Sequence, residues 1–199
     1  MTNEMWFQPL VWTDYKLAVI FTVLLPIILL IWGFIQKAEG VQRLLIVYWR
    51  VASLLMITVY LLIPSWPIGF VTGWFARVLI PISLWFWVDL NEEIADQPQR
   101  LLKLAVTSWR WSTTIYCILG VIATTPSLQC ALFTQAKIKS SFCKVWLEAP
   151  WGYGNIFHNG SSPGFLGFLG VVALCIYIIY LAYFILIRLA KQGRSAMEQ

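Results

Sequence analysis

The sequence predicts an all-α integral membrane protein, folded as a bundle of five transmembrane helices. The 199-residue chain is 60% hydrophobic and 16% aromatic, and its mean hydropathy is +0.75. Only 12% of its residues are charged, whereas a soluble domain has about 25%. Five apolar runs follow one another along the chain, and each is long enough to cross a hydrocarbon core of about 30 Å.

The predicted helices occupy residues of about 17–35, 44–63, 70–90, 104–125 and 165–187. Arg77 and Arg110 interrupt the third and fourth runs, but apolar and aromatic residues dominate on both sides of each arginine. Residues 126–164 are expected to form a long structured loop on the outer side. Because five spans and this loop use up the length, residues 1–199 are predicted to form a single transmembrane domain.

The distribution of lysine and arginine predicts the orientation of the bundle. Seven basic residues fall on one side of the predicted helices and four on the other. The first side has Lys37, Arg43, Arg100, Lys103, Arg188, Lys191 and Arg194, and the second has Lys16, Lys137, Lys139 and Lys144. Cytoplasmic loops carry an excess of Lys and Arg, so the N-terminus is expected outside, or in a lumen, and the C-terminus in the cytoplasm.

The net charge of +5 does not indicate a nucleic-acid partner. The basic residues are scattered over short loops and helix ends, as the topology bias of membrane proteins explains. Membrane lipids are therefore expected as partners, and nucleic acid is not.

Polar stripes are predicted on two of the helices. The fourth helix has Thr107, Arg110, Thr114, Cys117 and Val121, and the second has Arg50, Ser53, Ile57, Tyr60 and Pro64. Spacings of three and four residues place each set on one helix face, and such a face is expected to point into the protein or toward a partner. The stripes either hold helices together or form a path for a solute or a proton. The scarcity of carboxylates and histidines favours the structural interpretation.

Arg110 is predicted to pair with Asp89 in a structural ion-pair cluster. Arg110 lies roughly 9 Å past the predicted start of its helix, and Asp89 lies at the end of the preceding antiparallel helix. The long arginine side chain can reach toward the interface, and a carboxylate partner lowers the cost of placing it in a membrane. Arg50 has a similar depth in the second helix. It either competes for Asp89 or completes a cluster of three.

Cys130 and Cys143 are predicted to form a disulfide. Both lie in the outer loop, whereas Cys117 and Cys175 lie in predicted helices. An oxidising outer compartment would preserve the bond, and closing a loop near this size stabilises a fold by about 3 kcal/mol. Two free buried thiols are the alternative.

A small-residue face is predicted on the fifth helix. Gly164, Gly167, Gly170 and Ala173 recur at intervals of three residues. Such residues leave a groove that another helix can approach closely. Helix packing is the first interpretation, and a flat ligand such as a pigment ring or a lipid tail is the second. The sequence assigns no cofactor.

The sequence contains no catalytic signature, so the chain is not expected to be an enzyme. His158 is the only histidine, and without a neighbouring Cys, Asp or Glu it does not predict a metal site. It could bind the magnesium of a chlorophyll, but a local hydrogen bond is the favoured interpretation. A Walker loop, an HExxH motif and paired intramembrane carboxylates are all missing from the sequence.

Three segments carry a resemblance to a known family: VTGWFARVLIPISLWFWVDLNEEI, YWRVASLLMITVYLLIPSW and the short basic tail. Their pattern covers nearly the whole chain and resembles an uncharacterised family of small thylakoid-membrane proteins of cyanobacteria, known as a domain of unknown function. The resemblance implies a thylakoid membrane and an association with photosynthetic complexes. It implies no active-site residues.

The predicted function is that of a non-catalytic accessory or assembly protein of a larger membrane complex, by resemblance a photosystem. Aromatic-rich spans with few carboxylates and a small-residue helix face support this prediction, because such surfaces pack against partners or pigments. A small transporter is the alternative, with the two arginine-bearing stripes as a path for an anionic or amphiphilic solute. A lipid-modifying enzyme is the third class, and the scarcity of histidine and acidic residues disfavours it.

Overall fold

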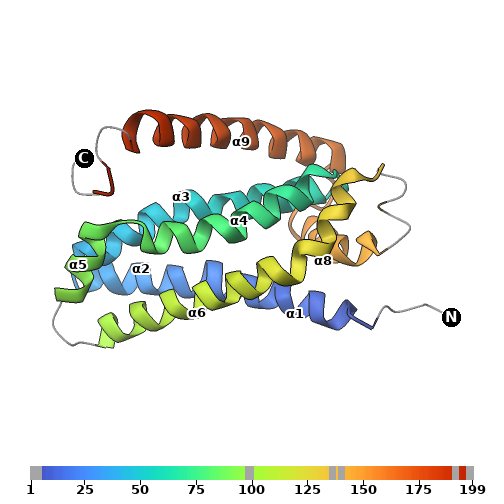
Figure 1. Cartoon of the computed structure of the whole chain (residues 1–199). Coiled ribbons are helices and arrows are strands. Elements are labelled where there is room, and N and C mark those ends of the chain that lie inside the picture. The colour runs from blue at the N-terminus through green and yellow to red at the C-terminus, as the bar shows by residue number, and fades with distance from the viewer. Residues whose placement is uncertain (1–5, 97–100, 135–137, 139–141, 190–192, 196–199) are drawn as a thin grey trace.

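The protein is helical throughout the part that its computed structural model describes, residues 6–96, 101–134, 138, 142–189 and 193–195 (Figure 1). Within these residues every regular element is a helix, which confirms the predicted all-α class. Five stretches are long and apolar enough to cross a membrane: Gln8–Ile35, Glu39–Leu62, Ile68–Trp85, Leu101–Leu132 and Pro163–Arg188. They coincide with the five apolar runs and indicate an integral membrane protein.

The first candidate span begins well before the predicted residue 17. It consists of α1 (Gln8–Val19), the π-helical turn η1 (Ile20–Leu24) and α2 (Leu25–Ile35). Pro9 lies in the first turn of α1, where a missing N–H has no intrahelical partner to lose. The helix therefore includes Asp14 and Lys16, which the sequence analysis placed before it.

Pro26 accounts for the π-helical turn. It lies in the first turn of α2 and has no N–H to donate to the Thr22 carbonyl, four residues earlier. The preceding N–H, that of Leu25, bonds instead to the carbonyl of Ile20, five residues back, which is the π-helical pattern. The turn thus leaves backbone carbonyls without partners in their own helix.

Side chains of two other helices satisfy these carbonyls. Tyr48 of α3 (Glu39–Leu62) donates its hydroxyl to Thr22 O at 2.8 Å. Trp109 of α6 (Leu101–Thr124) donates its indole N–H to Phe21 O at 2.9 Å. A buried carbonyl in a membrane needs such a partner, so the π-helical turn connects the first span to both neighbours.

The central helix of the bundle is α3. It packs against α2, against α4 (Ile68–Trp85) and against α9 (Pro163–Tyr183). Its fully buried side chains are Val41, Leu44, Leu45, Tyr48 and Leu61. Ser65, whose φ of 65° is uncommon outside glycine, lies in the turn that reverses the chain between α3 and α4.

The third candidate span ends at Trp85, short of the predicted residue 90. A separate short helix, α5 (Val88–Asp96), follows after the break at residues 86–87. Asn91 donates its side-chain amide to Trp85 O at 3.0 Å, which satisfies a carbonyl in the last turn of α4. Figure 1 shows α5 turned away from the axis of α4.

The predicted outer loop at residues 126–164 is largely helical. The 3-10 helix η2 (Thr125–Leu132) continues α6, and α8 (Cys143–Phe157) follows it. Ser162 caps α9 by accepting a hydrogen bond from the Phe165 N–H at 3.2 Å, as serine commonly does at this position. A second π-helical turn, η3 (Phe184–Arg188), extends α9.

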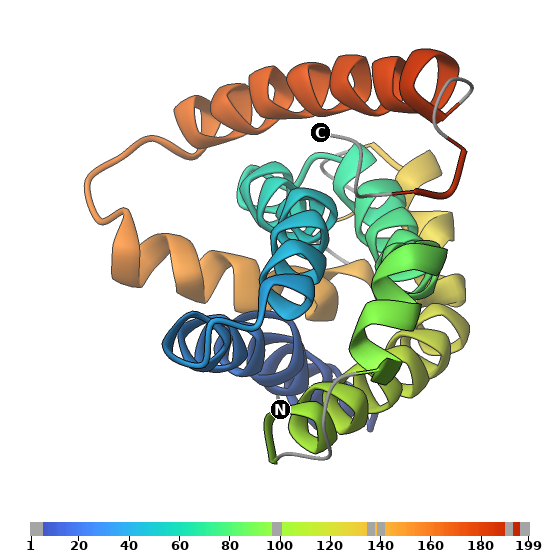
Figure 2. The ribbon, with the colours of Figure 1, turned by 90° about the vertical axis from the view of Figure 1, so that its left-hand side faces the viewer.

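Different helices lie at the two ends of the bundle (Figure 1). α8 and the start of α1 lie at one end, and α5 and the end of α9 lie at the other. Figure 2 shows α9 on one side of α3 and α4, and the first span on their other side. This arrangement makes α9 a peripheral helix.

Candidate functional site

An ion pair connects the first and third candidate spans in the half of the bundle nearer α8. Arg77 of α4 donates through Nη2 to Asp14 Oδ2 of α1, and their side chains are only 13% and 20% exposed. Tyr116 of α6 donates its hydroxyl to Asp14 Oδ1 at 2.9 Å. The carboxylate thus accepts charge-assisted and neutral bonds from two helices, which a partly buried charge needs for stability. We call Asp14, Arg77 and Tyr116 the Asp14 cluster.

Gly120 of α6 makes room for the Arg77 side chain. A Cβ at position 120 would lie 2.9 Å from Arg77 Nε and 3.0 Å from its Cδ. A larger residue would therefore displace the arginine from Asp14. The cluster was not predicted from the sequence, because the first helix was expected to begin after Asp14. Pro9, a typical first-turn residue, was the sequence signal for an earlier start.

Neutral groups, and not Asp89, bind Arg110. Its Nη2 donates to Leu84 O at 2.6 Å and to Asn91 Oδ1, and its guanidinium lies over the Trp85 ring, 4.1 Å from the centroid. The ion pairs between described residues do not include Arg110 and Asp89, so the predicted pair is wrong. We call Arg110 and its three partners the Arg110 cluster.

The break between α4 and α5 explains this error. The prediction assumed one continuous helix to residue 90, whereas Asp89 lies in the first turn of α5. There its Oδ1 accepts from the Leu90 N–H at 2.9 Å and its Oδ2 accepts from Ser195 Oγ at 3.1 Å. The start of a helix favours a negative charge, and the changed direction brings Asn91 to Arg110 in its place.

Arg50 does not belong to the Arg110 cluster either. It is exposed on α3, and its Nη1 donates to Tyr180 Oη of α9 at 3.2 Å. Depth along a helix does not fix the direction in which a side chain points, and Arg50 points toward α9. The prediction of a three-residue cluster is therefore wrong.

The two predicted polar stripes have different outcomes. On the fourth helix Arg110, Thr114 and Cys117 are buried, which confirms an inward face. On the second helix Arg50 and Ser53 are exposed, whereas Tyr60 and Pro64 are half-buried. Arg50 bonds to Tyr180 of α9, and Tyr60 bonds to His158 after α8, so this stripe faces neighbouring helices and not the apolar interior.

Replacing Asn91 by alanine should destabilise the protein by about 2 kcal/mol. The substitution removes an acceptor from the buried Arg110 guanidinium, and hydrogen bonds to charged groups contribute about 1.5–3 kcal/mol. Thermal unfolding in detergent would measure the effect. Glu92→Ala, at the exposed neighbouring position, is the matched control and should change stability by less than about 0.5 kcal/mol. Equal effects of the two substitutions would contradict the role assigned to Asn91.

His158 bonds across the fold, and not only locally as predicted. It follows α8, and its Nε2 shares a hydrogen bond of 2.8 Å with Tyr60 Oη of α3. The Tyr153 ring lies against both, with centroids 5.7 Å from His158 and 6.4 Å from Tyr60. Burial, together with Tyr60, raises the pKa of the Tyr153 hydroxyl. These groups hold α8 against the end of α3.

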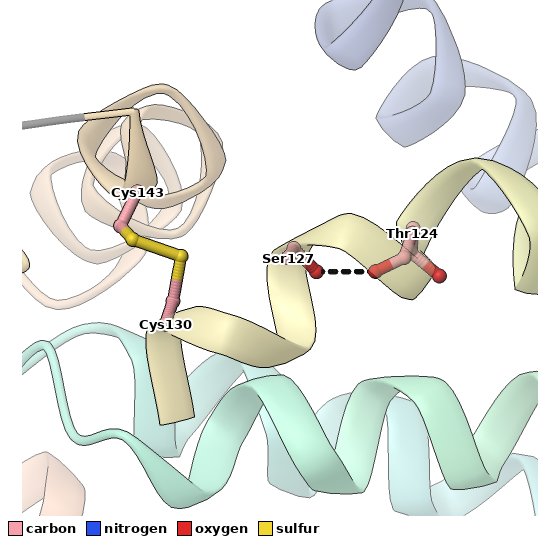
Figure 3. Close-up of a disulfide and its surroundings, with 4 residues drawn as sticks. All are labelled: Thr124, Ser127, Cys130 and Cys143. Atoms are coloured by element: carbon pink, nitrogen blue, oxygen red, sulfur yellow. Dashed lines mark hydrogen bonds between the residues drawn. A yellow bond between two sulfur atoms is a disulfide. The ribbon is translucent and has the colours of Figure 1, made fainter. Parts of the chain in front are cut away.

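The structure joins Cys130 and Cys143 in a disulfide, as predicted (Figure 3). Figure 3 shows the bond connecting η2 to the start of α8, next to the hydrogen bond of Ser127 Oγ to Thr124 O. Both cysteines are fully buried, and the small cluster around them includes Val11 of α1. The disulfide therefore fixes α8 to the end of α6 and close to α1.

The small-residue face of α9 packs on α3 over part of its predicted length. A Cβ on Gly167 would lie 2.6 Å from Pro64, and one on Gly170 would lie 3.2 Å from Leu61. Ala173 is half-buried beside them. Gly164 is exposed with open space around it, so its inclusion in this face is wrong. The first turn of α9 starts beyond the end of α3, which explains the difference.

A cavity of about 700 Å³ lies beside the Asp14 cluster. α1 and η1 form one wall, α3 and α4 form the opposite wall, and α8 closes the end. The cavity forms where the first span has separated from α3, since α2 packs on α3 whereas α1 packs on α8. Its lining is mostly apolar, and Lys16 and Arg77 are the charged residues that border it among those described.

One comparison with known proteins identifies a family. The family described as "Protein of unknown function (DUF3177)" matches residues 8–197, which is almost the entire chain. The chain belongs to this family. No curated protein and no solved structure matches it. Like the resemblance noted in the sequence, the family is a domain of unknown function, and its description names no activity.

Membership of the DUF3177 family assigns no function to the chain. In the described part of the chain, no three His, Cys, Asp or Glu side chains gather in a way that could hold a metal ion. Four features are the candidates that remain: the Asp14 cluster, the Arg110 cluster, the Tyr60–His158 bond and the cavity. Three of these are contacts between helices, and one is a space that a ligand could fill.

Proposed function

We propose that the chain is a non-catalytic membrane protein that serves as an accessory or assembly subunit of a larger membrane complex. The clusters inside its spans support the proposal. Asp14 is held by Arg77 and Tyr116, and Arg110 is held by a backbone carbonyl, an amide and an indole ring. Proton relays use chains of acidic groups or histidines. These clusters instead connect helices, which is the usual role of polar groups in a membrane bundle.

The peripheral position of α9 is the observation that carries the proposal. Only 17% of its most apolar stretch is buried, compared with 22% for the first span and 44% for α3. Its exposed large side chains include Phe165, Phe168, Ile176, Ile179 and Leu186. Helices associate in a membrane through close van der Waals packing. A helix that presents such a face at the edge of a bundle is suited to join the helices of a partner.

The proposed setting is a photosynthetic complex of the thylakoid membrane, with pigment contact at the outer face of α9. The resemblance of the sequence to thylakoid proteins supports this setting. The proposed arrangement is a five-span bundle with the N-terminus in the lumen and the C-terminus in the cytoplasm. The excess of lysine and arginine on one side of the spans supports that orientation.

Native gel electrophoresis after gentle solubilisation tests the accessory role. We expect the 22.9 kDa chain to migrate within a much larger complex. The double substitution Phe168→Ala with Ile179→Ala should reduce the fraction of the protein found in the complex, because it truncates two large side chains on the exposed face of α9. The matched control is Ile115→Ala with Ile122→Ala, which truncates two exposed side chains of α6. It should leave the fraction of protein in the complex unchanged. Migration only as a small colourless monomer or dimer would contradict the proposal.

A small transporter is the second candidate, and the cavity favours it. Arg77 and Lys16 border an apolar space that an anionic amphiphile could enter. Transport predicts that the purified protein speeds the movement of a labelled long-chain carboxylate across liposome membranes. If the protein has only the accessory role, the carboxylate should cross these membranes no faster than it crosses protein-free liposomes.

A further inference from the structure

The cavity beside the Asp14 cluster opens sideways between α1 and α3. Val19 and Ile20 border it on the first span and are 51% and 41% exposed, and Met56 borders it on α3 and is 47% exposed. These residues belong to the cavity wall and also to the apolar outer surface of two candidate spans. A hydrocarbon chain from the surrounding membrane can therefore enter the cavity without passing a polar barrier.

The interior of the cavity favours hydrocarbon over water. Apolar residues of three helices line it, among them Val23, Ala52, Leu55, Val59, Leu62 and Phe70. Water does not occupy a space that offers it few polar partners, and an empty space would deprive the lining atoms of dispersion contacts. The volume of about 700 Å³ lies in the usual range of ligand pockets, about 300–1,000 Å³. An acyl chain is apolar, as the lining requires, and is small enough for this volume.

One end of the cavity is basic and aromatic. Lys16 is exposed at the rim, one turn from Val19, and has no hydrogen-bond or ion-pair partner among the described residues. Arg77 also borders the cavity, but its charge is paired with Asp14. The aromatic residues at this end are Trp12, Tyr15, Trp74, Trp146 and Tyr153. Tryptophan and tyrosine concentrate at the level of lipid headgroups, which places the basic end at the membrane interface.

The nearby carboxylates do not border the cavity. Asp14 is committed to Arg77 and Tyr116. Glu148 of α8 accepts hydrogen bonds from Gln8 Nε2 at 2.8 Å and from the Trp12 indole N–H at 3.0 Å. Among the described residues, the charge that a ligand would meet without a partner is therefore that of Lys16.

We propose that the cavity binds an anionic amphiphile from the membrane. Its acyl chain fills the space between α1 and α3, and its headgroup lies at Lys16. This proposal goes beyond the accessory function, because the ligand binds whether or not a larger complex forms. The chemistry is shared by anionic phospholipids and by long-chain carboxylates.

Native mass spectrometry of the purified full chain tests the site. The protein would be exchanged into nanodiscs of phosphatidylglycerol and phosphatidylcholine in equal amounts, and the retained lipid would be counted after release. We expect phosphatidylglycerol to be retained at least about fivefold over phosphatidylcholine, since a lysine near an anionic surface contributes about that factor. Lys16→Gln should remove the preference, whereas Lys16→Arg and the control Lys144→Gln, an exposed lysine of α8, should keep it.

A second pair of variants tests the location of the acyl chain. Ser53→Trp fills the cavity from an exposed position of α3, and Ile46→Trp adds the same side chain outside it. Only Ser53→Trp should abolish lipid retention. Displacement of phosphatidylglycerol by added palmitate would assign the site to single-chain acids, and its absence would assign it to two-chain lipids; both support an anionic amphiphile. Equal retention of the two phospholipids by the wild-type protein, or full retention by Ser53→Trp, would overturn the proposal.

Discussion

Replacing Asp14 by asparagine is expected to destabilise the protein by about 3–5 kcal/mol. The substitution keeps the size of the side chain but leaves the Arg77 guanidinium, which is 13% exposed, without its carboxylate. Removing one partner of a buried pair is costly because the remaining charge is uncompensated. Thermal unfolding in detergent, followed by circular dichroism, would measure the loss.

Two further variants separate the ion pair from other effects of the substitution. Asp96→Asn removes a carboxylate at an exposed position of α5 and should change stability by less than about 0.5 kcal/mol. Asp14→Asn combined with Arg77→Met should cost less than the sum of the two single substitutions, because contacting residues are not additive. Additive losses would show that the two residues do not stabilise the fold as a pair.

Breaking the disulfide by Cys130→Ser is expected to cost about 3 kcal/mol in the chain-entropy model. The bond connects η2 to α8, and its two cysteines are fully buried. We expect the melting temperature of the wild-type protein to fall in reductant and that of Cys130→Ser to be low in either condition. Alkylation without reductant, followed by mass spectrometry, would verify that the wild-type pair is closed.

Cys175 provides the control for this experiment. It is a free, exposed cysteine of α9, so Cys175→Ser should keep both the stability of the wild-type protein and its sensitivity to reductant. Complete alkylation of Cys130 and Cys143 in the wild-type protein would contradict the pairing. An unchanged melting temperature in reductant would contradict its contribution to stability.

The helices could be predicted from the sequence wherever hydropathy alone determines them. The five apolar runs became five candidate spans, because an apolar stretch of sufficient length has few other solutions. The errors occurred at the ends of helices. Asp14 and Lys16 appeared to precede the first helix, since the partner that accommodates Asp14 is Arg77, which lies 63 positions further along the chain. At the end of α4, the Asn91 side-chain amide donates a hydrogen bond to the Trp85 carbonyl. Hydropathy does not reveal such a contact.

The candidate sites were predictable only where composition left one choice. Cys130 and Cys143 could be paired because the other two cysteines lie in apolar runs. Arg110 was correctly placed facing the interior, yet its partners were not predicted. A break of two residues before α5 decides which of Asp89 and Asn91 faces it. The cavity has no sequence signature, since it arises from the divergence of two helices.

The first span tolerates a change of length at some places and not at others. Each residue of an α-helix advances it by about 100°. Deleting one residue of α1 after Asp14 would rotate that carboxylate by about this angle relative to α2, so it would point away from Arg77 and Tyr116. The π-helical turn at Ile20–Leu24 holds one residue more than an α-helical turn, so deleting one residue there would change the phase of α1 much less. The same deletion in the exposed turn around Gly160 would change no helix phase.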